Sequence, residues 1–163
     1  MKKYFGQYIP GILICIFICQ LAGVVGAFYT MPVIKTWYAG LSKPFFNPPN
    51  WIFGPVWTIL FTMQGVALFL VWQRRRLDSP GVKLALEIFF LQLILNSLWS
   101  IFFFGWRIPV LAFGEIIFLW LAIASTIKYF YRVSKPAAWL LIPYILWVSF
   151  AALLNFFIIL LNP

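Results

Sequence analysis

Residues able to perform acid–base, nucleophilic or metal chemistry are scarce in this sequence of 163 residues. It has no histidine, two cysteines and only three carboxylates, which are Asp78, Glu87 and Glu115. Cys15 and Cys19 share one apolar run at a spacing that matches neither a CxxC redox motif nor a disulfide framework, so we interpret them as packing residues. We therefore predict no metal site, no cofactor and no acid–base pair.

Tryptophan is the residue type that offers the most chemistry, and most of the nine tryptophans divide into two groups by their position in the apolar runs. Four stand at the ends of these runs, where an aromatic belt at the membrane interface explains them: Trp51, Trp72, Trp106 and Trp139. Four others stand deep within the runs: Trp57, Trp99, Trp120 and Trp147. An indole N–H cannot bond to lipid, so we expect the deep indoles to point inward. They could serve helix packing or a flat pocket for a large aromatic ligand.

A polar stripe accompanies these indoles in the third apolar run. Gln92, Asn96 and Ser100 recur at a spacing of four, which places them on one face of a helix. Two interpretations stay open, because lipid cannot satisfy such groups. They could form hydrogen bonds between helices, or they could bind a ligand. Asn96 carries both a donor and an acceptor and could orient a ligand carbonyl or carboxylate.

Membrane-spanning helices must position these side chains. The chain is 64% apolar and 9% charged, with a mean hydropathy of +0.99, and lacks the polar surface that a soluble domain needs. A spanning helix needs about 20 apolar residues, and continuous apolar runs do not suit a β-barrel. Five segments qualify, at 9–29, 51–72, 82–104, 110–131 and 136–161. We predict an all-α integral membrane protein in which residues 1–163 form a single domain, a five-helix bundle.

The basic residues predict an orientation. With five crossings, one side collects nine of the 12 Lys and Arg residues: Lys2, Lys3, Arg74, Arg75, Arg76, Lys83, Lys128, Arg132 and Lys135. The other side has Lys35, Lys43 and Arg107. Because positive charge stays inside, we expect a cytoplasmic N-terminus and an outside C-terminus in a bacterial plasma membrane. The charge of +9 forms no single stripe, so the predicted partner is the lipid bilayer and not nucleic acid.

The connection 30–50 is long and unusually apolar. Four prolines prevent a continuous helix in it. It also contains large apolar side chains that are costly to leave in water: Trp37, Tyr38, Leu41, Phe45 and Phe46. We expect these side chains to be covered, and we interpret the loop as a lid over one mouth of the bundle. The alternative is a segment that lies flat among lipid headgroups.

Proline and the acidic residues inside the runs lead to further local predictions. Pro143 should kink the fifth helix one turn before Trp147. Glu87 and Glu115 enter the membrane from opposite sides, and we expect salt bridges or snorkelling near the interface. The small residues of the first run, Ala22 with Gly26 and Gly23 with Ala27, should allow close approach of a neighbouring helix.

Three motifs extend this interpretation to a family. The stretches WYAGLSKPFFNPPNWIFGPVW (37–57), LNSLWSIFFFG (95–105) and PYILWVSFAALLN (143–155) resemble the translocator protein family of tryptophan-rich sensory proteins, formerly peripheral benzodiazepine receptors. The resemblance covers nearly the whole chain. It implies a five-helix bundle, often a homodimer, with a pocket beneath the first loop that binds porphyrins and benzodiazepine-type ligands.

Carried over by position, the resemblance implies a set of ligand-binding residues: Tyr38, Trp57, Asn96, Trp147 and Ala151. It thus implies a membrane receptor or carrier for porphyrins, that is, for tetrapyrroles. Some bacterial family members are reported to promote light-dependent porphyrin breakdown, so the alternative is an enzyme that degrades porphyrin by light or redox chemistry through Trp57 and Trp147. A further alternative is a structural protein without a ligand.

The chain departs from the family at one point. Members that recognise cholesterol have a tyrosine followed by a basic residue late in the fifth helix, whereas this chain reads LLNFFIILLNP and has neither. Sterol binding at that position is therefore not expected. The sequence also has no ion-coupling pair and no nucleotide motif that would supply a driving force for transport.

Overall fold

Five long apolar helical segments form the molecule, as predicted. The computed structural model describes residues 8–74 and 80–163, and the five segments found there are 22 to 27 residues long. They are α2 (Ile9–Thr30), α4 (Asn50–Trp72), α5 (Pro80–Ser100) with the π-helical turn Ile101–Gly105, α6 (Pro109–Val133), and α7 (Lys135–Leu140) with α8 (Ile142–Leu161). A short helix, α3 (Trp37–Gly40), lies in the first loop, which we define as residues 31–49. The all-α five-helix prediction is confirmed.

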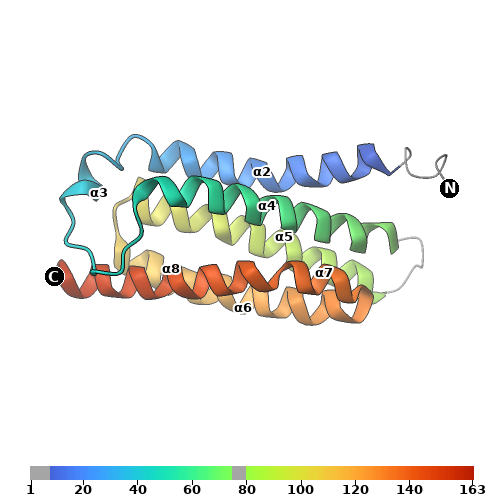
Figure 1. Ribbon diagram of the computed structural model, residues 1–163. Coiled ribbons are helices and arrows are strands. Elements are labelled where there is room, and N and C mark those ends of the chain that lie inside the picture. The colour runs from blue at the N-terminus through green and yellow to red at the C-terminus, as the bar shows by residue number, and fades with distance from the viewer. Residues whose placement is uncertain (1–7, 75–79) are drawn as a thin grey trace.

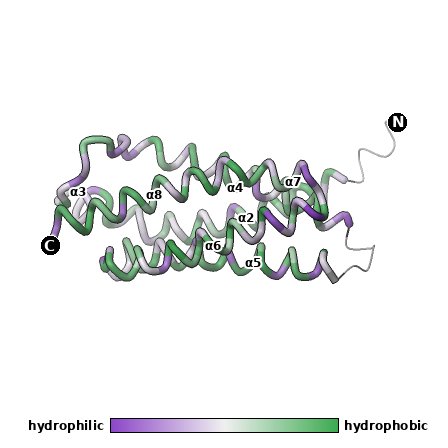
Figure 2. Tube along the Cα trace, turned by 90° about the horizontal axis from the view of Figure 1, so that it is seen from below, coloured by the Kyte–Doolittle hydropathy of each residue, from purple (hydrophilic) through white to green (hydrophobic). Residues whose placement is uncertain are grey.

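The helices run side by side along one axis (Figure 1). Helix α2 packs against α4 and α5, α5 packs against α6, and α6 packs against α8. The first loop with α3 lies at the same end of the bundle as the C-terminus, and the start of α2 lies at the opposite end. Hydrophobic residues, shown in green in Figure 2, occur along the whole length of the helices. Phe17 of α2 and Phe118 of α6, for example, are exposed on the outside, where acyl chains would cover them.

Helices α2 and α4 approach most closely at Gly65, a residue whose role the sequence did not indicate. A Cβ atom on Gly65 would lie 2.4 Å from the Ile16 Cα atom, so only a glycine fits there. The predicted small pairs of α2 meet side chains instead. Gly23 faces the ring of Phe61, and Gly26 faces the hydroxyl of Ser100. Their neighbours are therefore helices of the same bundle.

Prolines lie at the beginning of several helices. Pro109, Pro136 and Pro143 lie in the first turn of α6, α7 and α8, where the missing N–H has no helical partner in any case. The disruption of the fifth span that the sequence predicted at Pro143 is present. The helix is interrupted at Leu141, and α8 begins at Ile142. Because Pro143 has no N–H, it cannot give the Trp139 carbonyl the donor that a continuous helix would supply.

The end of α5 is wider than a regular α-helix. The Trp106 N–H donates to the Ile101 carbonyl at 2.7 Å, which is the five-residue step of a π-helix. Within this turn Phe103 is buried, and its ring contacts that of Tyr38 with 6.3 Å between the centroids. The π-helical turn therefore anchors the first loop to α5.

The two acidic residues inside the spans behave differently. Glu87 forms the expected exposed salt bridge with Lys83, with 3.8 Å between Nζ and Oε1. The prediction for Glu115 is wrong, since the residue is only 7% exposed and neither carboxyl oxygen has a partner among the described residues. Helical periodicity explains the difference, because Glu115 shares a face of α6 with the buried Ala112 and Leu119.

Four of the basic residues behind the predicted orientation, Lys2, Lys3, Arg75 and Arg76, lie outside the described part of the chain, as does Asp78. Cys15 and Cys19 of α2 are buried in the hydrophobic core, which confirms that they are packing residues.

Candidate functional site

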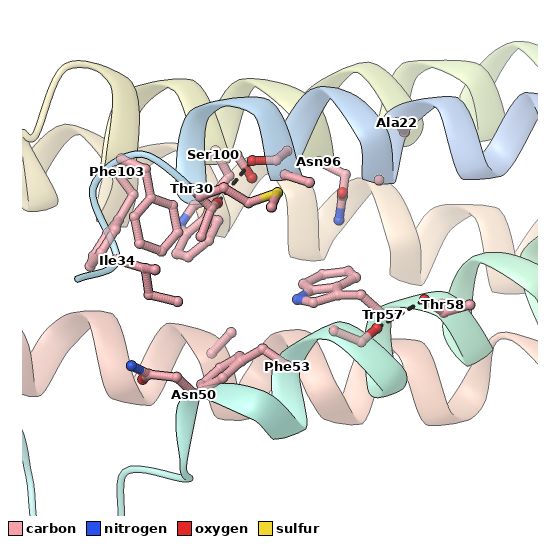
Figure 3. Close-up of a pocket in the computed structure, with 18 of the residues that line it drawn as sticks. Ala22, Thr30, Ile34, Asn50, Phe53, Trp57, Thr58, Asn96, Ser100 and Phe103 are labelled. Carbon is pink, nitrogen blue, oxygen red and sulfur yellow. Dashed lines mark hydrogen bonds between the residues drawn. The ribbon is translucent and has the colours of Figure 1, made fainter.

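A cavity of about 540 Å³ lies between α2, α4, α5 and α8, beneath the first loop (Figure 3). The structure brings all five predicted site residues to its wall: Tyr38, Trp57, Asn96, Trp147 and Ala151. Within residues 8–74 and 80–163, no Asp, Glu, Lys or Arg lines the cavity. The polar groups of the wall are amides, hydroxyls and indole N–H groups, so the cavity suits an apolar ligand that forms a few hydrogen bonds.

Two indoles from different helices form much of the aromatic wall. Trp57 of α4 stacks on Phe61 with 5.4 Å between ring centroids and an interplanar angle of 26°. Trp147 of α8 contacts Phe53 edge-on at 5.8 Å. The Trp147 Nε1 is buried and has no partner among the described residues, so this donor is unused inside the protein. The two indoles thus give the wall flat apolar faces, whereas the Trp147 N–H lies buried behind that surface.

The prediction that every deep indole points inward is wrong for Trp120. This residue of α6 is 38% exposed and does not line the cavity. Its Nε1 donates to the Ser149 hydroxyl of α8 at 2.9 Å. Because a neighbouring helix supplies an acceptor on the outer surface, the indole satisfies its N–H without turning into the bundle.

The polar stripe on α5 divides between the wall of the cavity and a contact between helices. Asn96 and Ser100 line the cavity, whereas Gln92 lies behind its wall. The Gln92 Nε2 donates to the Gln64 Oε1 of α4 at 3.1 Å, which joins the two helices. The stripe therefore leaves the cavity at Gln92 and continues as a hydrogen-bonded contact inside the bundle.

Tyr38 links the first loop to the cavity. It is buried, and its hydroxyl donates to the Asn47 Oδ1 at 3.2 Å across the loop. The Lys43 Nζ lies 4.7 Å from the centre of the Tyr38 ring. Burial raises the pKa of the Tyr38 hydroxyl above its ordinary value, and the hydrogen bond to Asn47 opposes this shift. Tyr38 is therefore a neutral hydrogen-bond donor at physiological pH.

The expectation that the whole first loop is covered fails at Phe45. Its side chain is 99% exposed. Its ring contacts that of its neighbour Phe46, with 5.3 Å between the ring centroids. Phe46 packs against Phe157 of α8, also at 5.3 Å. The loop therefore has an inner face, which covers the cavity, and an outer face. Phe45 on the outer face suits the alternative interpretation, in which the loop lies among lipid headgroups.

The five predicted site residues omitted two groups of wall residues, although Trp99 was expected to point inward as a deep indole and does so. Trp99 and Asn155 line the cavity and bond to each other, with 3.3 Å between the indole Nε1 and the amide Oδ1. Gly23 and Gly26 form the wall on the α2 side. The signals were present in the sequence as a deep indole and as small residues at helical spacing, but neither signal indicates which neighbour a helix face will meet.

The first loop is fastened to the end of α8 by one side chain. The Asn162 Oδ1 accepts a hydrogen bond from the Ser42 N–H at 3.0 Å, and the Asn162 Nδ2 donates to the Ser42 carbonyl at 2.9 Å. The same Nδ2 also donates to the Ile158 carbonyl at 2.8 Å. A side-chain amide can pair with both backbone groups of one residue because it offers a donor and an acceptor side by side.

Replacing Asn162 with aspartate is expected to loosen the first loop. The carboxylate retains the acceptor for the Ser42 N–H, but it loses the donor and places an oxygen against two carbonyls. Since each lost hydrogen bond is worth about 1 kcal/mol, amide hydrogen exchange across 36–48 should be about fivefold faster or more. Hydrogen-exchange mass spectrometry of the protein in nanodiscs measures this.

Ser42→Ala is the matched control, because Asn162 contacts only the backbone of Ser42. This variant should exchange like the wild type. Wild-type exchange in Asn162→Asp would show that the contact does not hold the loop.

The amino-acid sequence is similar to those of known proteins. A model of the TspO/MBR family matches residues 15–161. The chain is 48% identical over 140 residues to the tryptophan-rich protein TspO of Archaeoglobus fulgidus, with 86% of this chain and 89% of the relative covered. It is 44% identical to the protein of the same name from Chlorobaculum tepidum, over 92% and 94%. It is 38% identical to the human translocator protein, over 74% and 71%.

Proposed function

Because the chain belongs to the TspO/MBR family and is an integral membrane protein, we propose that it is a membrane receptor or carrier for flat aromatic ligands. The ligands are porphyrins and benzodiazepine-type compounds, and they bind in the cavity beneath the first loop. One observation carries the proposal. Indoles from two different helices, Trp57 and Trp147, line one uncharged cavity whose volume is about 540 Å³.

The chemistry of the wall supports an aromatic ligand. Large rings bury much apolar area and pack favourably edge-on or offset against a planar ligand. The amide of Asn96 can orient a polar group on that ligand. The name of the human relative, Translocator protein, accords with a role in carrying a ligand.

The first loop acts as the lid of this site. It contributes Ile34 and Tyr38 to the cavity wall, and Asn162 fastens it to α8. Ligands then enter from the side of the membrane where the C-terminus lies. From the distribution of Lys and Arg, this is the outside of a bacterial plasma membrane, with a cytoplasmic N-terminus. Reporter fusions at the two ends test this orientation. The homodimer that the family resemblance implies stays a prediction.

A titration of the protein in nanodiscs with protoporphyrin tests the proposed function. We expect saturable quenching of tryptophan fluorescence, because the ligand lies against the indoles of the cavity. Quenching that rises linearly with protoporphyrin, as in empty nanodiscs, would show partition into lipid and would refute the proposal.

A further inference from the structure

A chain of four buried side chains runs from the cavity into the bundle. The Asn96 Nδ2 of α5 donates to the Tyr144 hydroxyl of α8 at 3.0 Å, and this hydroxyl donates to the Gln92 Oε1 at 2.9 Å. The Gln92 Nε2 then donates to the Gln64 Oε1 at 3.1 Å. All four residues are at most 6% exposed, and only Asn96 lines the cavity.

The hydroxyl of Tyr144 gives this chain its direction. It has a single hydrogen, and since that hydrogen goes to Gln92, its oxygen is left to accept from Asn96. Each of the three hydrogen bonds is therefore donated in the direction away from the cavity. Such bonds polarise one another, which strengthens the common direction. The chain ends at the Gln64 Nε2, which is buried without a partner within the described residues.

The consequence appears at the cavity end. With its Nδ2 turned toward Tyr144, the amide of Asn96 cannot rotate freely, and its Oδ1 makes no hydrogen bond to the described residues. The acceptor of this amide is therefore free for a ligand, whereas one of its two N–H donors is held by Tyr144. A free asparagine could offer either its oxygen or its nitrogen, so the neighbour that holds the amide decides which ligands fit.

We propose that Tyr144 is a positioning residue that holds the Asn96 amide with its oxygen toward the cavity, so that the site prefers flat aromatic ligands with an N–H or O–H donor. This inference rests on the proposed function and narrows its ligand class. Tyr144 touches no ligand itself, since it does not line the cavity. It acts through Asn96 alone.

A pair of tricyclic probes of similar size and shape tests the preference. Carbazole carries an N–H donor at the position where fluorenone carries a carbonyl acceptor. Both compete with protoporphyrin for the protein in nanodiscs. The wild type should bind carbazole about fivefold to tenfold more tightly, since one hydrogen bond is worth about 1 kcal/mol. Equal affinities, or a preference for fluorenone, would overturn the proposal.

Two variants separate positioning from a merely structural role. Tyr144→Phe removes the group that holds the amide, so the ratio of the two affinities should fall to about one. Gln92→Met removes the oxygen that accepts the hydrogen bond of the Tyr144 hydroxyl. The hydroxyl should then donate to the Asn96 Oδ1, which requires the amide of Asn96 to flip. The Asn96 N–H then faces the cavity, and the preference should reverse in favour of fluorenone. Tyr131→Phe, at an exposed tyrosine of α6, should leave the ratio unchanged.

The failures are distinguishable. If protoporphyrin does not bind saturably to the wild type, the proposed function fails. If it binds but the carbazole preference survives in both Tyr144→Phe and Gln92→Met, only the positioning role fails. The NMR signal of the Asn96 side-chain amide in the ligand-free protein adds a measurement that needs no ligand. It should shift in Tyr144→Phe, and an unchanged signal would also overturn the positioning role.

Discussion

Gly65→Ala is expected to destabilise the protein strongly, although it adds a single methyl group. The new Cβ atom would lie 2.4 Å from the Ile16 Cα and 2.7 Å from the Ile16 N, and backbone atoms of α2 cannot move aside as a flexible side chain could. Helices α2 and α4 must separate. Overpacking of this kind costs about 1 to 3 kcal/mol or more. Thermal unfolding in detergent should therefore show a melting temperature several degrees below that of the wild type.

Gly114→Ala is the control for this prediction. Gly114 also lies inside a helix, α6, and a Cβ there meets no atom within 4 Å. Alanine should stabilise this position by about 0.5 to 1 kcal/mol, because glycine loses more conformational freedom on folding. Similar shifts for Gly65→Ala and Gly114→Ala would show that the close approach of α2 and α4 does not matter for stability.

Gly65→Ala should also weaken ligand binding. Gly23 and Gly26 of α2 and Trp57 of α4 line the same cavity, so separation of these two helices widens it. A wider cavity leaves part of a flat ligand without contacts on one side. The protoporphyrin titration in nanodiscs measures this loss at a temperature where Gly65→Ala remains folded.

Trp147→Ala is expected to reduce protoporphyrin affinity by about 30-fold or more, because truncation of a central aromatic residue at a binding site commonly costs about 2 kcal/mol or more. The substitution removes both a flat wall of the cavity and the unpaired Nε1 donor. Competition with a labelled ligand is the better measurement, since the quenching signal itself depends on the indoles.

Trp120→Ala is the matched control, since it deletes an indole of the same size that lies on the outer surface and bonds to Ser149. Its affinity should equal that of the wild type. Trp147→Phe divides the effect further, because it retains a ring and loses the N–H. If Trp147→Ala and Trp120→Ala reduced affinity equally, the loss would reflect general destabilisation and the cavity would not be the binding site.

The residues that sequence reasoning placed correctly are those whose position follows from local pattern. The apolar runs set the five spans to within a few residues, because the thickness of the bilayer dictates their length. The resemblance of three motifs indicated Trp57, Asn96 and Trp147, and these meet at one cavity. The errors, at Trp120, Glu115 and Phe45, share a cause. Each depends on which face of a segment the rest of the bundle covers, and the sequence of that segment alone does not contain that information.

The sequence by itself determined the class of protein and the residues available to its site. Hydropathy selects membrane helices, and the composition supplies few side chains for acid–base or metal chemistry. Tertiary structure alone decided which of these residues meet. It turned Trp147 inward and Trp120 outward, brought Gly65 against Ile16, and connected Asn96 to Tyr144 of a helix 48 residues away in the sequence. The physical reason is that hydrophobic burial is non-directional, whereas the contacts that orient a side chain come from another helix.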